Sequence, residues 1–347
     1  MIEGHDDLFG TNVLLVTGKG GVGKTTTAAA LGLAAADSGR DTLLVEVEGR
    51  DTLSRAFATT AWDYQEREFR PGLWGVSLDP AEAVYEYLEL FYGLRRVQWM
   101  MERSHALDFV TTAAPGLRDL LLIGKVYEIE ARRRADGRRL FDTIIVDAPP
   151  TGRIVPFLQS PSAVTEIVRM GPIRRQSGQI EAMLTDPSRC RALVVTLLEE
   201  MPVTEAAEGI VAMAAAGVAT GPVVANQVVV PAVTAEQAEV LCGDPAPVRD
   251  VAAGVGLDLD DHDLAGLTTM VSDHRVTVAR QRRLATRLQA GTGRDLLVLP
   301  DLAADTFDVD ALHVLADTIA RQVGADGPTG LDVAGIVAEP DSSEGGR

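Results

Sequence analysis

Cysteine is nearly absent from this sequence, since only Cys190 and Cys242 occur in 347 residues. Two cysteines so far apart are too few for a disulfide framework, and neither belongs to a C-x-x-C pair that would bind zinc or carry redox chemistry. We therefore expect no structural zinc. Both thiols are predicted to be small buried hydrophobic groups.

Long apolar runs are also missing. Nowhere do about 18 uncharged apolar residues follow one another, which is the length of a membrane-spanning helix. The first twelve residues, MIEGHDDLFGTN, have neither the basic start nor the apolar stretch of a secretion signal. These absences predict a cytoplasmic protein.

Positive charge is the third deficit, because 32 Lys and Arg residues face 50 Asp and Glu residues, a net charge of −18. Non-specific binding to DNA or anionic lipid depends on counterion release by Lys and Arg, so we expect no nucleic-acid partner. The run ARRRADGRR is a local exception, and it is predicted to be the solvated C-terminal end of a helix, where cations favour the helix dipole. Its arginines are Arg132, Arg133, Arg134, Arg138 and Arg139.

The pattern of apolar runs predicts the fold class. Apolar, β-branched segments alternate with helical patterns along the chain, which is typical of an α/β protein with a doubly wound, mostly parallel sheet. The expected strands lie near residues 13–16, 43–47, 73–77, 143–146, 193–197, 223–225 and 296–299. We expect one domain over residues 1–323, with a helical subregion at about 80–134, and a flexible acidic tail over 324–347.

Aromatic and methionine side chains gather in one part of that helical subregion, residues 84–109. They are Tyr85, Tyr87, Phe91, Tyr92, Trp99, Met100 and Met101. Aromatic and methionine residues at helical spacing form either part of the core or a partner surface, and both interpretations stay open.

A phosphate-binding loop follows the first expected strand. Gly18 to Thr25, GKGGVGKT, fits G-x-x-x-x-G-K-[ST] and opens an Ala-rich helix that runs to about Asp37. Such a loop turns its backbone N–H groups toward phosphate oxygens, and the helix N-terminus adds partial positive charge. Lys24 is expected to reach the β- and γ-phosphates of ATP, and the Thr25 hydroxyl to ligate Mg²⁺. The predicted nucleotide-binding residues here are Gly20, Gly21, Val22, Gly23, Lys24, Thr25 and Thr26.

A second lysine, Lys19, is not required by that motif. It would be redundant inside a cradle already served by Lys24, so its side chain is expected to point outward. The stretch KGGVGKT resembles the deviant Walker A loop of the signal-recognition, MinD and BioD class of P-loop NTPases. The resemblance implies a face-to-face dimer in which Lys19 crosses to the nucleotide of the opposite subunit, as an arginine finger does.

Asp147 is the candidate for the second magnesium-binding residue, because it ends a parallel strand beside the phosphate loop. The segment that follows resembles the D-T-A-P-T-G-H switch II of arsenical pump-driving and tail-anchored-protein targeting ATPases. Asp147, Pro150, Thr151 and Gly152 match that pattern, whereas Ala148, Pro149 and Arg153 depart from it.

Further segments are similar to the same ArsA-like, anion-transporting ATPase family. PGLRDLL, from Pro115, resembles a helix start of that family; VVANQ resembles its V-V-N-Q segment, which implies that Asn226 reads the adenine. LVLPDL resembles its late adenine loop, around Pro300. The family resemblance implies an ATPase that uses ATP and Mg²⁺ and couples their turnover to a client or membrane transport partner.

Departures from the family limit the functional prediction. Neither cysteine matches an arsenite-binding cluster, and the segment after switch II, residues 160–190, is too short and too broken to cover a membrane helix of about 20 residues. In switch I, alignment with the family's S-T-D-P-A-H segment places Glu48 where the family has the aspartate that positions the attacking water. The extra methylene of Glu48 displaces the carboxylate by about 1 Å.

Two functions therefore remain open. The first is a dimeric, ATP-hydrolysing switch, as a homodimer or as a heterodimer with a paralogous ATPase subunit, with Lys19, Glu48 and Asp147 as catalytic residues. The alternative is a nucleotide-binding regulatory subunit of an unequal dimer, with little ATPase activity of its own, in which Lys19 serves its partner's nucleotide. The other possibility for Glu48 is that it positions the attacking water as well as an aspartate does.

Overall fold

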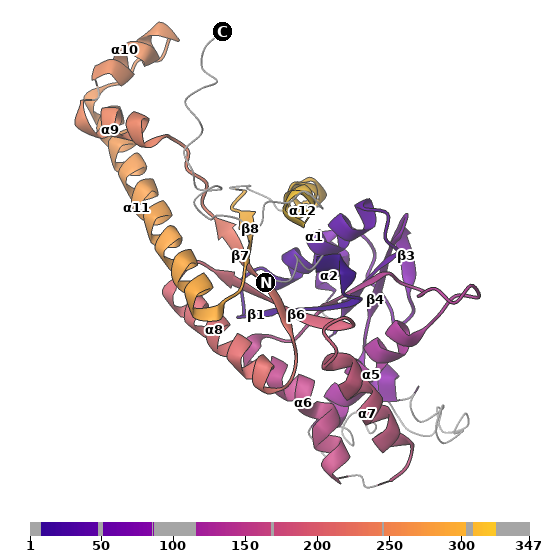
Figure 1. The fold of residues 1–347 in the computed structure, drawn as a ribbon. Coiled ribbons are helices and arrows are strands. Elements are labelled where there is room, and N and C mark those ends of the chain that lie inside the picture. Colours follow the sequence, from indigo (N-terminus) through magenta and orange to yellow (C-terminus); the bar gives the residue numbers. More distant parts are fainter. Residues whose placement is uncertain are drawn as a thin grey trace.

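An eight-stranded sheet forms the centre of the molecule (Figure 1). The computed structural model describes residues 8–47, 51–84, 86, 116–167, 170–244, 246–302 and 308–323. The strands lie in the order β3-β4-β2-β5-β1-β6-β7-β8, and every neighbouring pair is parallel except β3 and β4. The predicted doubly wound, mostly parallel sheet is confirmed.

The strands are β1 (Val13–Gly18), β2 (Thr42–Glu46), β3 (Arg67–Arg70), β4 (Leu73–Ser77), β5 (Thr143–Asp147), β6 (Cys190–Leu197), β7 (Thr220–Val228) and β8 (Leu296–Pro300). Seven of them coincide with the strands expected from the sequence. The eighth, β3, was missed because three of its four residues, REFR, are charged, and because it is partly exposed and pairs antiparallel at the sheet edge. An edge strand needs no apolar run, so its sequence carries little signal.

Helices cover both faces of the sheet (Figure 1). They are η1 (Leu8–Gly10), α1 (Lys24–Asp37), α2 (Thr52–Ala56), α5 (Leu117–Ala131), α6 (Thr151–Ile167), α7 (Pro172–Leu184), α8 (Glu200–Ala215), α9 (Ala235–Gly243), α10 (Ala246–Gly254), α11 (Asp261–Thr292) and α12 (Val309–Val323). One face packs against α1 and α12, and the other against α5, α6, α7, α8 and α11. Burial on both faces explains why the central strands are continuous apolar runs rather than alternating ones.

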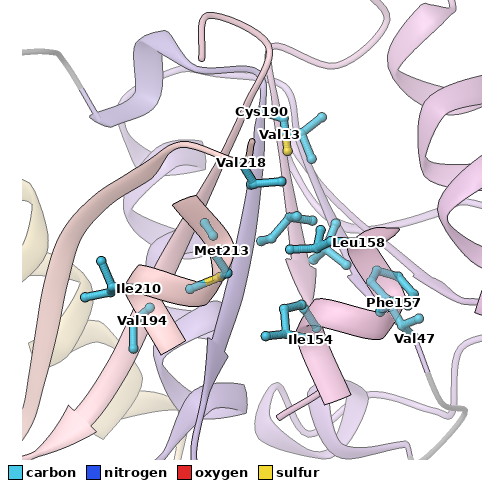
Figure 2. Close-up of a cluster of buried hydrophobic side chains, with 14 of the residues drawn as sticks. Val13, Val47, Ile154, Phe157, Leu158, Cys190, Val194, Ile210, Met213 and Val218 are labelled. Carbon is cyan, nitrogen blue, oxygen red and sulfur yellow. The ribbon is translucent and has the colours of Figure 1, made fainter. Parts of the chain in front are cut away.

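The larger of the two cores lies under α6 and α8 (Figure 2). Phe157 and Ile154 of α6, Met213 of α8 and Val194 of β6 are fully or almost fully buried there. Cys190 lies in the same core, as predicted, and burial raises the pKa of its thiol to about 12. Cys242 was predicted to be buried too, but it is exposed on α9, so that prediction was wrong.

The long helix α11 carries α9 and α10 at the end that is farther from the sheet (Figure 1). Side chains of Ala238, Leu241 and Val271 form a small separate core there. Within the described ranges, no helix is both long enough and apolar enough to cross a membrane.

The arginine-rich run agrees with its prediction only in part. Helix α5 ends at Ala131, the first residue of the run, and the Arg134 N–H then donates a backbone hydrogen bond of 2.8 Å to the Arg138 carbonyl oxygen in a short turn. Arg132 forms ion pairs with Glu66 and Glu128, at 2.8 and 2.7 Å. The run therefore does begin at a helix end, with Arg133 and Arg138 exposed as expected, whereas acidic partners hold Arg132.

Three other expectations fall on residues that the structure does not describe. The aromatic side chains of residues 85–101 and the tail, 324–347, lie outside the described residues, as does most of the helical subregion predicted at 80–134. The division into one domain with a subregion and a tail therefore stays a prediction.

Removing the Phe157 ring should test the packing under α6. Phe157 is 1% exposed, so Phe157→Ala should lower the free energy of unfolding by about 3–5 kcal/mol, since it removes buried apolar surface and leaves a cavity. Val211→Ala is the control, because Val211 is 68% exposed on α8 and its truncation should change stability by no more than about 0.5 kcal/mol. Urea unfolding measures both, and a loss below about 1 kcal/mol for Phe157→Ala would contradict the assigned packing.

Candidate nucleotide and magnesium site

The candidate site lies at the carboxyl ends of three neighbouring parallel strands. Residue pairing across β1, β5 and β2 places Val16 beside Asp147, and Asp147 beside Glu46. In open α/β sheets, ligands bind at this edge, where loops leave the strands. The register therefore brings the phosphate loop after β1 together with two carboxylates that end β5 and β2.

The phosphate loop, which connects β1 to α1, has positions at which only a residue without Cβ fits. Gly23 has a φ of 87° at the start of α1, and a Cβ there would lie 2.2 Å from Asn226 Nδ2. A Cβ at Gly18 would lie 2.2 Å from the carbonyl oxygen of Val195. The loop is thus pressed against β6 and β7, which explains the glycines at these two places.

Asn226 contacts this loop from β7. It is 4% exposed, and its Nδ2 donates a buried hydrogen bond of 2.9 Å to the carbonyl oxygen of Val22. This contact supports the backbone of the phosphate loop. Its expected role in reading adenine stays a prediction, as does that of Pro300, which ends β8 and is partly buried.

Lys24 lies over the loop that it follows. Its Nζ donates a hydrogen bond of 3.2 Å to the carbonyl oxygen of Lys19. Gly20 and Gly21 are exposed at the loop, whereas Thr26 is partly buried in the first turn of α1. An ammonium group at the opening of a loop rich in backbone N–H groups makes this place attractive to phosphate.

Thr25 and Asp147 meet beside Lys24. The Thr25 hydroxyl donates a hydrogen bond of 2.6 Å to Asp147 Oδ2, so the two predicted magnesium-binding residues lie together. A hydroxyl and a carboxylate are the oxygen ligands that Mg²⁺ prefers. They line a recess of about 80 Å³ whose other lining residues are Lys24, Glu46, Val47, Thr52, Ala148 and Pro150. These residue types fit a magnesium ion with part of its hydration shell.

The start of switch II is attached to β1. The Thr17 hydroxyl donates a buried hydrogen bond of 2.7 Å to the carbonyl oxygen of Pro149, and the Ala148 N–H donates one of 2.9 Å to Val16. Helix α6 then begins at Thr151. On its other side β5 pairs with β2, so both neighbouring strands hold the backbone that carries the Asp147 carboxylate at the recess.

Lys19 points toward another helix. Its Nζ lies 2.6 Å from Glu205 Oε1 on α8, and about a third of each side chain is exposed. This ion pair keeps the Lys19 ammonium away from Thr25 and Asp147. Its expected action across a dimer interface stays a prediction.

Two carboxylates belong to the sequence at the end of β2: Glu46, its last residue, and Glu48, two residues later. Glu48, the residue expected to position water, lies outside the described residues. Glu46, two residues earlier, was not singled out in the sequence, yet it is 2% exposed and lines the recess. A carboxylate at the end of a buried parallel strand was the signal, and the same signal identified Asp147.

The fold and this loop define a P-loop NTPase. A family model described as anion-transporting ATPase matches residues 11–180. The sequence is 36% identical to "ATPase BagA" of Mycobacterium tuberculosis, over 91% of this chain and 94% of the relative. The chain therefore belongs to the anion-transporting ATPase family, and the predicted ATPase class is confirmed.

More distant relatives include an "Arsenical pump-driving ATPase" of Escherichia coli, 25% identical over 89% of this chain and 54% of the relative. "ATPase GET3" of Meyerozyma guilliermondii is 28% identical over 52% of this chain and 53% of the relative. The matched region thus covers about half of each of these two relatives. The family resemblance expected from the motifs is confirmed.

Replacing Gly23 should show how strongly the loop depends on its backbone conformation. Gly23→Ala should cost at least about 1–2 kcal/mol of unfolding free energy, because it puts a Cβ in the left-handed region and against Asn226. Gly20→Ala is the matched control, since Gly20 has no left-handed φ and a Cβ there meets nothing within 4 Å among the described residues. Equal unfolding midpoints of the two variants in urea would refute the assigned strain.

Proposed function

We propose that this chain binds Mg·ATP at the recess between the phosphate loop and Asp147, and hydrolyses it as one half of a dimeric switch. The observation that carries this proposal is the 2.6 Å hydrogen bond between Thr25 and Asp147, directly beside Lys24. A hydroxyl, a carboxylate and an ammonium group within one recess are what phosphoryl transfer from ATP requires. Family membership supports the same activity.

Each residue has a defined task in this proposal. The loop N–H groups and the N-terminus of α1 hold the phosphates, and Lys24 neutralises charge on the β- and γ-phosphates. Thr25 and Asp147 hold the magnesium ion, directly or through water. When bound, the ion neutralises charge that develops on the transferring phosphoryl group. Because the protein positions these groups before reaction, little reorganisation is left for the chemical step.

Dimer formation gives Lys19 its task. We infer that Lys19 leaves Glu205 and reaches the nucleotide of the opposite subunit when two chains meet face to face. The pair is about one-third exposed on each side, so exchanging one carboxylate for a phosphate costs little desolvation. The dimer is a homodimer or contains a paralogous ATPase subunit, and its nucleotide state is coupled to a client or membrane transport partner in the cytoplasm.

A regulatory subunit is the second candidate function. The sequence favours it at one position, because Glu48 stands where the family places an aspartate that handles the attacking water. An added methylene moves that carboxylate, and a misplacement of about 1 Å can cost about a hundredfold in rate. In such an unequal dimer, this chain binds ATP, supplies Lys19 and leaves most turnover to its partner.

Loss of the Lys24 ammonium tests the binding site. Lys24→Ala should weaken Mg·ATP binding by about 100-fold or more, because a charge-assisted contact inside the cradle is removed. Arg138→Ala removes one positive charge from an exposed turn and should leave the affinity within about twofold. Isothermal titration calorimetry measures both variants. Undiminished binding by Lys24→Ala would remove the site assignment.

Variants of the Lys19–Glu205 pair test the role across the dimer. Lys19→Ala should leave Mg·ATP affinity of the single chain within about threefold but lower turnover of the assembled dimer by at least about tenfold, because a trans-acting cation serves the transition state. Glu205→Gln removes the partner in cis and keeps Lys19, so turnover should be retained or raised. Steady-state phosphate release, with and without the co-purified partner, is the measurement. An unchanged rate with Lys19→Ala would exclude the role in trans.

A further inference from the structure

Within the described part of the chain, Glu46 has hydrogen-bond partners for only one of its two carboxylate oxygens. Its Oε1 accepts hydrogen bonds from the backbone N–H and from the hydroxyl of Thr52, both at 2.6 Å. Its Oε2 is buried and has no hydrogen-bond partner among the residues that the structure describes. The whole residue is 2% exposed.

An acceptor of this kind is unusual in a protein interior. Buried polar groups almost always have a hydrogen-bond partner. A buried carboxylate oxygen without one loses its hydration and gains no hydrogen bond that compensates. Glu46 therefore points to a ligand that the described part of the chain does not supply. The recess that it lines has room for several water molecules.

The sheet register shows where that ligand binds. Glu46 and Asp147 are paired residues on adjacent parallel strands, so their side chains leave the same face of the sheet. That is the face covered by α1, and Thr25 of α1 bonds to Asp147. Glu46 consequently shares one recess with the two residues proposed to hold magnesium.

We propose that Glu46 is a positioning residue of the Mg·ATP site. Its Oε2 accepts a hydrogen bond from a water molecule bound to the magnesium ion, while its Oε1 holds the start of α2 through Thr52. The inference rests on the magnesium site proposed above. It makes Glu46 the physical connection between the ion and the helix that follows switch I.

The chemistry of metal-bound water selects a carboxylate here. The oxygen of such a water is committed to the ion, so both of its protons must be donated to acceptors. An ionised carboxylate only accepts hydrogen bonds, and charged acceptors form the stronger ones. Because Glu46 bonds α2 with its other oxygen, occupancy of the ion site and the position of α2 become coupled through one rigid group.

Glu46→Gln distinguishes the two oxygens. The Thr52 N–H is a donor, so the amide oxygen of the glutamine takes the Oε1 place and the NH₂ group takes the Oε2 place. That NH₂ group donates and cannot accept a proton from a metal-bound water. The variant therefore keeps the bond to α2 and removes the proposed contact with the ion. Glu239→Gln is the matched control, since it makes the same exchange on the exposed surface of α9 and leaves the recess unchanged.

The experiment measures how much magnesium strengthens nucleotide binding. The affinity for a non-hydrolysable ATP analogue is determined by calorimetry with Mg²⁺ and with EDTA, and the ratio of the two is compared among variants. We expect Glu46→Gln to lower this ratio about tenfold or more, with an unchanged affinity in EDTA, and Glu239→Gln to keep it within about twofold. Mn²⁺ binding to the analogue-loaded protein, followed by electron paramagnetic resonance, should weaken in parallel.

A wild-type ratio in Glu46→Gln would overturn this inference and leave the nucleotide site standing. Failure of the wild-type chain to bind the analogue in either condition would overturn the site itself, and the inference with it. One readout needs no substitution: Mg²⁺ added to the analogue-loaded wild-type chain should slow amide hydrogen exchange in α2, residues Thr52–Ala56. Unchanged exchange there would equally overturn the proposed connection.

Discussion

The parallel register of β2, β5 and β1 is the constraint on which the site depends. It aligns Glu46 with Asp147, and Asp147 with Val16 two residues before the phosphate loop. A slip of one residue would turn either carboxylate to the opposite face and replace it with an apolar side chain. Because both faces of these strands are buried, such a slip would also put a charge into a dry core. The hydrophobic effect thus positions the polar groups of the site, although it acts on other residues.

The same packing explains why the loop can hold a strained shape. Glycines with positive φ run through it, and Gly18 and Gly23 lie against Val195 and Asn226 with no room for a side chain. The Asn226 amide bonds the Val22 carbonyl, and Lys24 bonds that of Lys19, so two loop carbonyls are already satisfied. The loop N–H groups can then serve a ligand. The conformation of the loop therefore depends on its contacts with β6 and β7 as well as on its own sequence.

Seven strands, the phosphate loop and the partners Thr25 and Asp147 were predictable because each depends on a local pattern: an apolar run, a glycine spacing, or a carboxylate that ends a strand. Strand β3 was not predictable, since a charged edge strand carries no such pattern. The ion pairs of the arginines after Ala131 were not predictable because their acidic partners, Glu66 and Asp41, come from distant parts of the sequence. The exposure of Cys242 and the lack of a hydrogen-bond partner for Glu46 Oε2 among the described residues likewise depend on tertiary contacts that spacing along the chain does not reveal.

Two further tertiary contacts connect the site to neighbouring helices. Glu46 connects the recess to α2 through Thr52, and Lys19 connects the phosphate loop to α8 through Glu205. The first contact is part-buried and consists of two hydrogen bonds to one carboxylate oxygen, so it suits a lasting connection between the recess and α2. The second is partly exposed and bonded once, so a competing anion can break it at low cost. The two contacts therefore differ in role because they differ in burial. The buried Glu46 carboxylate suits a permanent connection within one chain, whereas the partly exposed Lys19 suits a change of partner to a second chain.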